Sequence, residues 1–394
     1  MKIYLVGGAV RDKRLGIPVR ERDWVVVGAT PDDMLRQGFK PVGKDFPVYL
    51  HPQTREEYAL ARTECKTAPG YTGFRTCADP DIPLEQDLQR RDLTINAMAE
   101  TAAGELIDPY GGANDLANGI LRHVSHAFAE DPVRILRVAR FAARFAHRGF
   151  HVAHETNTLM RQMVTAGEVD HLVPERVCAE LTKALEEKTP ARFFDVLYGC
   201  GALAKLFPEI EPLFGDDARA RHGHATATFP ALQAAVKLDA RPPVRFAALM
   251  CDIDQHHGPD RGTTWLLNLC ERLRTPNAWR ELAVMALNQR AHIHQATAMS
   301  ASRLLETLNA IDAFRRRKRF EDLLRVYQAD ALAHQLTTDA EYPQGKLLQQ
   351  AHQAALGVKI DAASMVGKNG QAIGDEIRKR RIAAIHDLIR KYHS

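Results

Sequence analysis

The stretch KIYLVGGAVRD (2–12) decides the fold of this 394-residue chain. Residues 2–6 are mostly aliphatic and aromatic, which predicts a strand. Gly7-Gly8 predicts a tight turn that leads directly into a helix, and Gly8 lets a backbone approach a phosphate chain closely. Main-chain N–H groups at such a turn can bind phosphate. Arg11 follows one turn into the predicted helix, where it can neutralise phosphate charge.

The second decisive stretch is RERDWVVVGA (20–29), which predicts a strand over 22–28 with acidic residues at its start. Side chains two apart on a strand point to the same face, so we expect Glu21 and Asp23 to lie side by side. Two carboxylates at this spacing suit Mg²⁺. A Gly-Gly turn alone is typical of any tight turn. An acid pair beside such a turn indicates nucleotidyl transfer.

Length and composition indicate a globular protein with two to four domains or subdomains. Hydrophobic residues make up 45% of the chain, and no apolar run reaches the roughly 18 residues that span a bilayer. The N-terminus is too short for a secretory signal. The six cysteines are scattered without a CxxC pair, which argues against a disulfide framework or a zinc cluster. We therefore expect a cytoplasmic protein without membrane contact.

The predicted fold class is α+β, with a nucleotidyltransferase-type mixed β-sheet head followed by an all-α body and tail. The expected strands cover residues 2–6, 22–28, 47–51, 56–62 and 105–107. Thr30 is the expected N-cap of a helix over 30–38, residues 65–83 read as a long loop, and 84–100 has helical periodicity. The body helices are expected at 174–187, 190–206, 228–239, 244–251, 263–273, 278–289, 301–310, 316–335, 344–356 and 372–392.

Two further motifs carry basic side chains. QRRDLTINAMA (89–99) offers Arg91, which is either a surface cation or a ligand of a triphosphate. AEDPVRILRVARFAARF (129–145) predicts a helix with an acidic N-terminus and arginines at three-residue spacing. Those arginines form either a solvated stripe or a nucleotide-binding row. In the second interpretation Asp131 accepts from an exocyclic amine of a base, and Arg134 donates to a ring nitrogen or carbonyl oxygen.

Together these motifs resemble those of a bacterial class II tRNA nucleotidyltransferase, the CCA-adding enzyme, whose family shares its head with bacterial poly(A) polymerase. The resemblance covers essentially the full length and suggests the long bacterial type with a degenerate HD domain. Its motifs are LVGGAVRD (5–12), RDWVVVGATP (22–31), ALARTE (59–64), RRDLTINAMA (90–99), IDPYGGANDL (107–116) and EDPVRILRVARFAARF (130–145). Weaker matches are PERV (174–177), FPEI (207–210) and RKRRIAAIHDL (378–388).

The resemblance implies template-independent addition of C, C and A to the tRNA 3′ end from CTP and ATP, with Mg²⁺ as cofactor, a two-metal mechanism and release of pyrophosphate. It assigns Glu21 and Asp23 to catalysis and metal binding. The residues it assigns to ATP and CTP binding are Gly8, Arg11, Arg91, Asp131, Arg134, Arg137 and Arg140, and Glu130 falls in the same base-selecting motif. Residues 65–83 correspond to a flexible loop that helps the family switch from CTP to ATP.

The resemblance also implies a division of the chain and a set of partners. The expected regions are a catalytic head (1–125), a helical neck (126–215), a degenerate HD-like region (216–335) and a tail (336–394). The helical body would hold the acceptor arm of tRNA. The protein itself is expected to be a monomer or a homodimer. RRRKR (315–319) and RKRR (378–381) are candidates for that surface, and a solvated helix face is the alternative for each.

Two positions depart from the family pattern. The metal pair of the family is usually two aspartates, whereas Glu21 adds a methylene to the first. Long bacterial members carry a metal-binding His-Asp pair, and here Cys251-Asp252 stands in its place, with Ala227 where an upstream histidine would be. Four histidines lie nearby, but polar clusters of this kind are more often surface residues: His222, His224, His256 and His257. We therefore expect a structural remnant of the phosphohydrolase domain.

Other activities remain as alternatives. A poly(A) polymerase would share the head, and a CC-adding enzyme would stop after two cytidines. A non-catalytic relative would bind tRNA without incorporating nucleotide. A phosphohydrolase would require the histidine that Cys251 replaces.

Overall fold

The computed structural model describes residues 1–42, 48–66, 74–214, 229–257, 263–336, 341–359 and 369–392. The chain divides into two compact units, Met1–Glu211 and Pro212–Ser394. The β-sheet lies in the first unit, and the described elements of the second unit are all helical. The predicted α+β class, with a sheet head and a helical body, is therefore confirmed. The finer division at residues 125, 215 and 335 stays a prediction.

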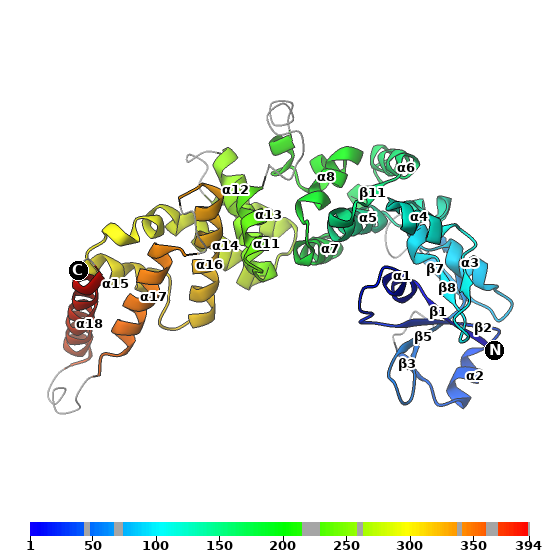
Figure 1. Cartoon of the computed structure of the whole chain (residues 1–394), viewed down its shortest axis with the longest axis horizontal. Coiled ribbons are helices and arrows are strands. Elements are labelled where there is room, and N and C mark those ends of the chain that lie inside the picture. Colours follow the sequence, from blue (N-terminus) through cyan, green and yellow to red (C-terminus); the bar gives the residue numbers. More distant parts are fainter. Residues whose placement is uncertain are drawn as a thin grey trace. The chain divides into compact units, whose positions relative to one another are not determined.

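Unit 1 contains a mixed seven-stranded sheet in the order β3-β4-β5-β2-β1-β8-β9 (Figure 1). Its strands are β1 (Lys2–Val6), β2 (Asp23–Val27), β3 (Lys40–Val42), β4 (Val48–Leu50), β5 (Glu57–Leu60), β8 (Ala99–Glu100) and β9 (Leu106–Ile107). β2 is antiparallel to β1 and parallel to β5, with Val6 opposite Asp23 and Asp23 opposite Glu57. The end of β1 and the beginnings of β2 and β5 therefore meet at one edge.

Both faces of the central strand β2 are covered, which explains its uninterrupted valines. Val26 packs with Met34 of α2 (Pro31–Arg36) on one face. Val25 packs with Leu88 of α3 (Leu84–Gln89) on the other. The predicted N-cap of α2 is confirmed, because the Thr30 side chain accepts from the main-chain N–H of the third residue of the helix.

The predicted helix over 84–100 is wrong beyond Gln89. There the chain turns, forms a 3₁₀ helix (Thr94–Asn96) and then pairs β8 with β1. The Asp92 carboxylate accepts from the Leu93 main-chain N–H at 2.9 Å and from Asn96 Nδ2 at 2.9 Å. A short acidic side chain that satisfies local donors in this way competes with the helix.

The expected long loop at 65–83 is also partly wrong. β6 (Arg62–Lys66) pairs antiparallel with β7 (Phe74–Ala78), so residues 65–66 and 74–78 of this segment belong to a two-stranded sheet. Residues 67–73, between the strands, lie outside the described residues, as does any test of a nucleotide switch there. The Pro, Gly and Thr content of the segment hid the alternation expected of a hairpin.

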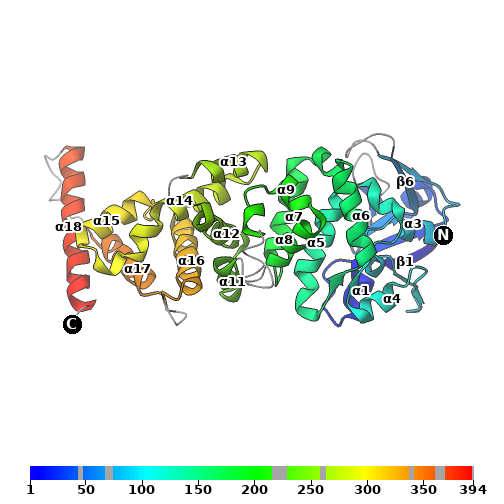
Figure 2. The ribbon, with the colours of Figure 1, turned by 90° about the horizontal axis from the view of Figure 1, so that it is seen from above.

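The remaining helices of unit 1 are α1 (Gly8–Arg14), α4 (Gly112–Asn118), α5 (Val133–Phe145), α6 (His154–Thr165), α7 (Pro174–Glu186), α8 (Ala191–Cys200) and α9 (Ala202–Leu206). In Figure 2, α5, α7 and α8 lie together. α5 is buried along most of its length. The predicted helix over 190–206 is split into α8 and α9 at Gly201, whose φ of +82° ends the first helix.

Unit 2 is built from α11 (Pro230–Lys237), α12 (Pro242–His257), α13 (Thr264–Arg272), α14 (Asn277–His294), α15 (Ala301–Ala310), α16 (Arg317–Ala333), α17 (Pro343–Leu356) and α18 (Gly370–Tyr392). α12 extends to residue 257, beyond the end at residue 251 that the sequence predicted. α11, α12, α14 and α16 pack on one another, whereas α15, α17 and α18 form a second group (Figure 1). Among the described residues, no helix is long and apolar enough to cross a membrane.

Candidate active site

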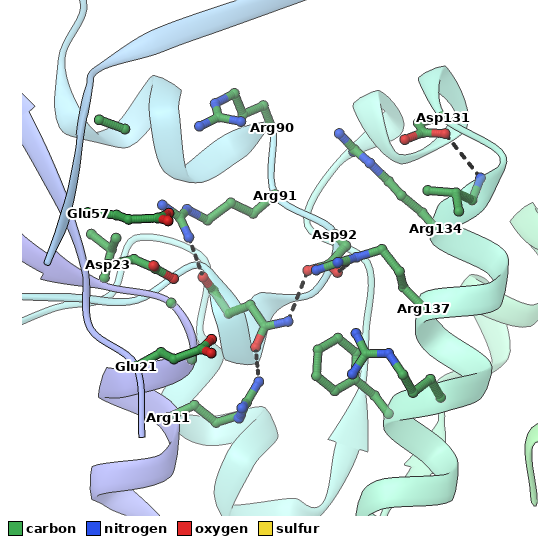
Figure 3. A pocket seen from close by; sticks show the side chains of 18 of the residues that line it. Arg11, Glu21, Asp23, Glu57, Arg90, Arg91, Asp92, Asp131, Arg134 and Arg137 are labelled. Carbon is green, nitrogen blue, oxygen red and sulfur yellow. Dashed lines mark hydrogen bonds and ion pairs between the residues drawn. The ribbon is translucent and has the colours of Figure 1, made fainter. Parts of the chain in front are cut away.

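One cleft in unit 1, with a volume of about 780 Å³, collects every residue predicted for catalysis or nucleotide binding (Figure 3). The cleft lies where the strand ends of the sheet face α5 and α7. Ten basic and six acidic side chains line it, a balance that favours a polyanion. The predicted residues in its wall are Gly8, Arg11, Glu21, Asp23, Arg91, Asp131, Arg134, Arg137 and Arg140.

The acid pair differs in one respect from the prediction. β2 begins at Asp23, so Glu21 lies in the preceding coil and the same-face argument does not apply to it. Both residues nevertheless line the cleft. Partial desolvation raises the pKa of Asp23 above its ordinary value, the nearby Arg91 guanidinium opposes that shift, and the Glu21 carboxylate adds to it. A raised carboxyl pKa beside a second carboxylate is typical of an acid pair whose charge is not yet neutralised.

Glu57 is a third carboxylate of the cleft, and the sequence motifs did not predict it. It lies in register with Asp23 on the neighbouring parallel strand β5. Figure 3 shows Glu21, Asp23 and Glu57 on one side of the cleft and Asp131 with Arg134 on the other. The pairing of β2 with β5 is not visible in the sequence, because the two strands are separated by α2, β3 and β4. No local signal could therefore have found Glu57.

The Gly-Gly turn requires glycine at its first position. Gly7 has a φ of +68°, and a Cβ there would lie 2.8 Å from Nη1 of Arg91. Arg91 in turn donates to Oδ2 of the buried Asp87 at 3.3 Å. A side chain at position 7 would thus displace the guanidinium that overlies the turn. The glycine motif drew attention to Gly8 instead, yet among the described residues a Cβ added at Gly8 would meet only the Arg11 side chain, at 3.5 Å.

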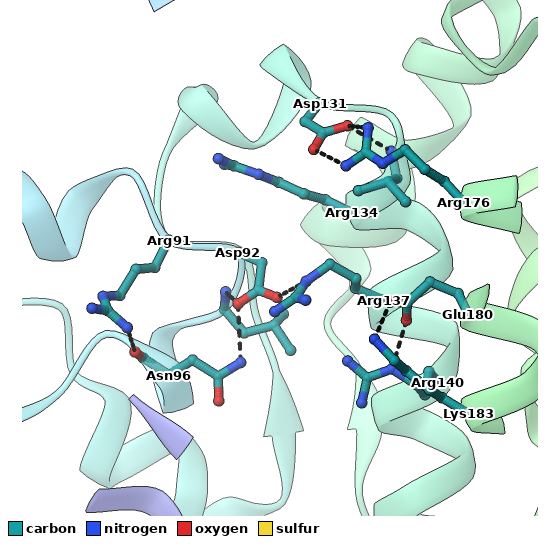
Figure 4. Close-up of polar contacts among 12 residues, drawn as sticks. Arg91, Asp92, Asn96, Asp131, Arg134, Arg137, Arg140, Arg176, Glu180 and Lys183 are labelled. Atoms are coloured by element: carbon teal, nitrogen blue, oxygen red, sulfur yellow. Dashed lines mark hydrogen bonds and ion pairs between the residues drawn. The ribbon is translucent and has the colours of Figure 1, made fainter. Parts of the chain in front are cut away.

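A chain of polar contacts links α1 to α5 across the floor of the cleft. Arg11 is only 3% exposed; its guanidinium donates to Asp12 Oδ1 at 2.8 Å and to the Asn96 side chain. Asn96 donates to Asp92, which also accepts from Arg137 Nε at 2.6 Å (Figure 4). Burial by itself raises the pKa of Asp92, but Arg137 and the hydrogen bonds overcome this and hold it well below the ordinary value. Arg11 is therefore a positioned group rather than a mobile surface cation.

α5 presents its arginines to the cleft in a fixed row. Nε of Arg140 donates to Glu180 of α7 at 2.6 Å, and the Arg140 guanidinium lies 4.5 Å from the centre of the Phe141 ring. Arg137 lies over the same ring at 5.9 Å. Ion pairs on one side and an aromatic face on the other restrict these guanidinium groups. The alternative of a solvated outer stripe is wrong for Arg140, which is buried.

At the start of α5, Asp131 and Arg134 occupy the end of the cleft away from the acid pair. Asp131 Oδ1 accepts from the Val133 main-chain N–H at 3.1 Å. Arg176 of α7 donates to both oxygens of Asp131, at 3.0 and 2.7 Å (Figure 4). Nη1 of Arg134 donates to the Ala127 carbonyl at 2.9 Å. The PERV motif pointed weakly to this part of α7, but neither Arg176 nor Glu180 was predicted as part of the site.

The HD-like position in unit 2 has a structural role. Asp252 is 3% exposed and accepts from the main-chain N–H groups of Ala231 and Leu232, both at 2.9 Å, so its oxygens cap α11. Cys251 is buried beside it. Ala227, His222 and His224 lie outside the described residues, as do the side chains of His256 and His257.

Acidic neighbours partly neutralise the two basic clusters of the body. Arg316 and Arg319 share Glu281, at 2.6 and 3.1 Å. Arg378 pairs with Glu306 at 3.0 Å. A role of these clusters in RNA binding stays a prediction.

An acid pair at a Gly-Gly turn, set in a mixed sheet and facing a row of arginines, defines a nucleotidyltransferase head. Residues 3–122 match the family model described as the poly A polymerase head domain. Residues 149–214 match the model described as the probable RNA and SrmB-binding site of polymerase A.

Relatives that match this chain over nearly its whole length show the family to which it belongs. The chain is 53% identical to the multifunctional CCA protein of Nitrosococcus oceani, over 99% of each chain. It is also 53% identical to that of Thioalkalivibrio sulfidiphilus, over 98% of each. The chain belongs to the family of the multifunctional CCA proteins.

Solved structures agree on the fold. The CCA-adding enzyme of Bacillus stearothermophilus in complex with CTP is 22% identical, with a TM-score of 0.67 over 99% of this chain and 89% of that chain. The Thermotoga maritima CCA-adding enzyme complexed with tRNA is 21% identical, with a TM-score of 0.64 over 100% and 92%.

Proposed function

We propose that this protein adds C, C and A stepwise to the 3′ end of tRNA, taking CTP and ATP and releasing pyrophosphate. The observation that carries the proposal is that one cleft holds an acid pair, a row of arginines and, at its far end, Asp131 with Arg134. Side chains placed to contact a base can select a nucleotide without a nucleic-acid template. The names of the relatives, and the CTP and tRNA complexes of the structural neighbours, support this function.

The two base-facing residues fit cytosine and adenine better than uracil and guanine. Cytosine and adenine each place an exocyclic amine beside an unprotonated ring nitrogen, so they offer a donor next to an acceptor. Asp131 can accept from the amine, and Arg134 can donate to the ring nitrogen. Uracil and guanine present the opposite order on the same edge, a carbonyl oxygen beside a ring N–H. Asp131 would then face another acceptor, which disfavours those bases.

The acid pair fits a divalent cation bound together with substrate. Within the described residues, no three His, Cys, Asp or Glu side chains converge as a complete metal site. Mg²⁺ is commonly held by one or two carboxylates together with substrate phosphates and water, so Glu21 and Asp23 would suffice as its protein ligands. When bound, Mg²⁺ supplies charge neutralisation for the attacking and leaving oxygens of an in-line displacement.

The chain's own cations act on the triphosphate. Arg91, held at the Gly-Gly turn, and Arg137 and Arg140, held on α5, offset the negative charge that the leaving pyrophosphate accumulates. Because these guanidinium groups are already fixed by Asp87, Asp92 and Glu180, little reorganisation is needed on binding.

The proposal is tested with tRNA that lacks its 3′ end, labelled CTP and ATP, and Mg²⁺. We expect two cytidines and one adenosine on each acceptor. Growth past one adenosine would instead indicate a poly(A) polymerase, and arrest after two cytidines a CC-adding enzyme. Binding of tRNA with no incorporation of either nucleotide would show a non-catalytic relative and end the proposal.

A further inference from the structure

A second cavity adjoins the cleft at its acidic end. This groove has a volume of about 440 Å³, and Glu21, Asp23 and Glu57 line both the groove and the cleft. The arginines of the groove are different from those of the cleft: they are Arg20, Arg22 and Arg55. The three carboxylates therefore form a shared wall with basic side chains on either side.

The geometry of phosphoryl transfer indicates from which side each substrate approaches the three carboxylates. The attacking and leaving oxygens lie roughly in line on opposite sides of the α-phosphorus. If the triphosphate lies against Arg91 and the α5 arginines, the attacking hydroxyl must reach the carboxylates from another side. The groove is an opening at those carboxylates that none of the cleft arginines lines.

The basic side chains of the groove are available for a ligand. Arg20 and Arg55 are exposed, and neither makes an ion pair within the described part of the chain. Arg22 is different, because it pairs with Glu56 at 3.3 Å. Glu56 also accepts from Trp24 Nε1 at 2.9 Å, which fixes that side of the groove.

Arg55 also occupies an unusual backbone conformation. Its φ is +63°, a left-handed value that glycine or asparagine adopts at less cost. The turn is held by His51, whose carbonyl accepts from Arg55 N at 3.1 Å and whose Nδ1 accepts from Thr54 N at 3.2 Å. This left-handed turn places Arg55 among the residues that line the groove, together with the carboxylates of the acid pair.

We propose that this groove binds the 3′-terminal nucleotides of the acceptor RNA, with Arg20 and Arg55 on its terminal phosphates and the 3′-hydroxyl directed at the acid pair. The inference rests on the proposed function and adds to it the site of the second substrate. The charge pattern fits such a ligand, because phosphates meet the arginines while only an uncharged hydroxyl has to approach the carboxylates.

The kinetic test compares an Arg20→Ala/Arg55→Ala double variant with the wild type on a short hairpin that carries the acceptor-arm end. The matched control is Arg14→Ala/Arg36→Ala, since both residues are exposed on the same unit and line neither cavity. We expect KM for the RNA to rise about fivefold or more in the groove variant. The slope of log kcat/KM against log salt should fall by about 1.4, since each single-strand phosphate contact contributes about 0.7. The CTP dissociation constant should stay within about twofold of wild type.

A turnover-independent test uses the same hairpin with 4-thiouridine as its 3′-terminal nucleotide, photocrosslinked to the chain. Crosslinks within residues 19–22 or 54–57 support the groove. Crosslinks confined to other segments, or an RNA KM in the groove variant equal to that of the control, would overturn it. If the wild-type chain crosslinks in the groove but adds no nucleotide, the proposed function fails while the RNA site stands.

Discussion

The contact between Arg176 and Asp131 gives the sharpest prediction about nucleotide choice. Arg176 donates to both carboxylate oxygens of Asp131 from a different helix. The Arg176→Ala variant leaves Asp131 with the Val133 N–H alone, which holds one oxygen. The carboxylate can then rotate away from the orientation in which it accepts from a base amine. We expect kcat/KM for CTP and ATP to fall, while the contacts to the triphosphate remain.

The size of the effect follows from the exposure of the pair. Hydrogen bonds to charged groups contribute about 1.5–3 kcal/mol each when well shielded. The Arg176 and Asp131 side chains are 24% and 21% exposed, so screening reduces the whole bidentate contact to about 1–2 kcal/mol. That range corresponds to a loss of about 5- to 30-fold in kcat/KM. The ratio of kcat/KM for CTP to that for UTP should fall as well, because uracil has no exocyclic amine for Asp131 to contact.

The assay is single-nucleotide addition to tRNA ending before its first added cytidine, with CTP and UTP compared and pyrophosphate inhibition measured in parallel. The matched control is Arg192→Ala, which removes a partly exposed arginine paired with Asp195 on α8, outside the lining of the cleft. An unchanged ratio of kcat/KM for CTP to that for UTP in Arg176→Ala would refute the reasoning. It would show that α5 alone orients Asp131.

Three further predictions test the acid pair, the packing of the head and the buried Asp252 of unit 2. Glu21→Gln should abolish nucleotide addition with an unchanged circular dichroism spectrum; full residual activity would remove Glu21 from the metal site. Gly112→Ala should destabilise unit 1 by about 2–3 kcal/mol in urea unfolding, because its Cβ would lie 2.2 Å from the Thr94 carbonyl oxygen. As a control, the Cβ added by Gly374→Ala would meet no atom of the described residues within 4 Å, so this substitution should be neutral or slightly stabilising. Burial raises the pKa of Asp252 to about 7, although the two main-chain N–H contacts oppose this shift. The protonated Asp252 therefore stabilises the fold fully below about pH 4, and this stabilisation should be lost as the pH rises toward 7. Asp252→Asn should flatten that decline in the unfolding free energy of unit 2, and an unchanged slope would contradict the assignment.

Local patterns predicted most helices and the central strands, because those elements satisfy their own hydrogen bonds or alternate cleanly. α15 and β1 have the predicted bounds, and α7 differs by one residue at its end. The errors arose where a side chain competes with the backbone, as Asp92 does after α3. They also arose where pairing partners are distant, as in the hairpin of β6 and β7.

The site was predictable where its residues sit within short motifs, and not where a second element completes them. Asp131 and Arg140 could be identified from one motif, residues 129–145. Their partners Arg176 and Glu180 belong to α7, forty or more residues later. Glu57 depends on the register of two parallel strands. Residues of this kind join the site only when separate helices or strands pack together, and the sequence alone does not show which elements become neighbours.

α5 and the turn that leads into it carry two groups of side chains that line the cleft. Asp131 lies two residues before the helix and Arg134 lies in its first turn, and Arg137 and Arg140 follow on the same helix, which rises about 1.5 Å and turns about 100° per residue. A single inserted or deleted residue between Arg134 and Arg137 would rotate Arg137 and Arg140 to another side of the helix while leaving Asp131 and Arg134 in place. The number of residues between Arg134 and Arg137 therefore matters as much as their identity, because it sets the angle about the helix axis between the two groups of side chains.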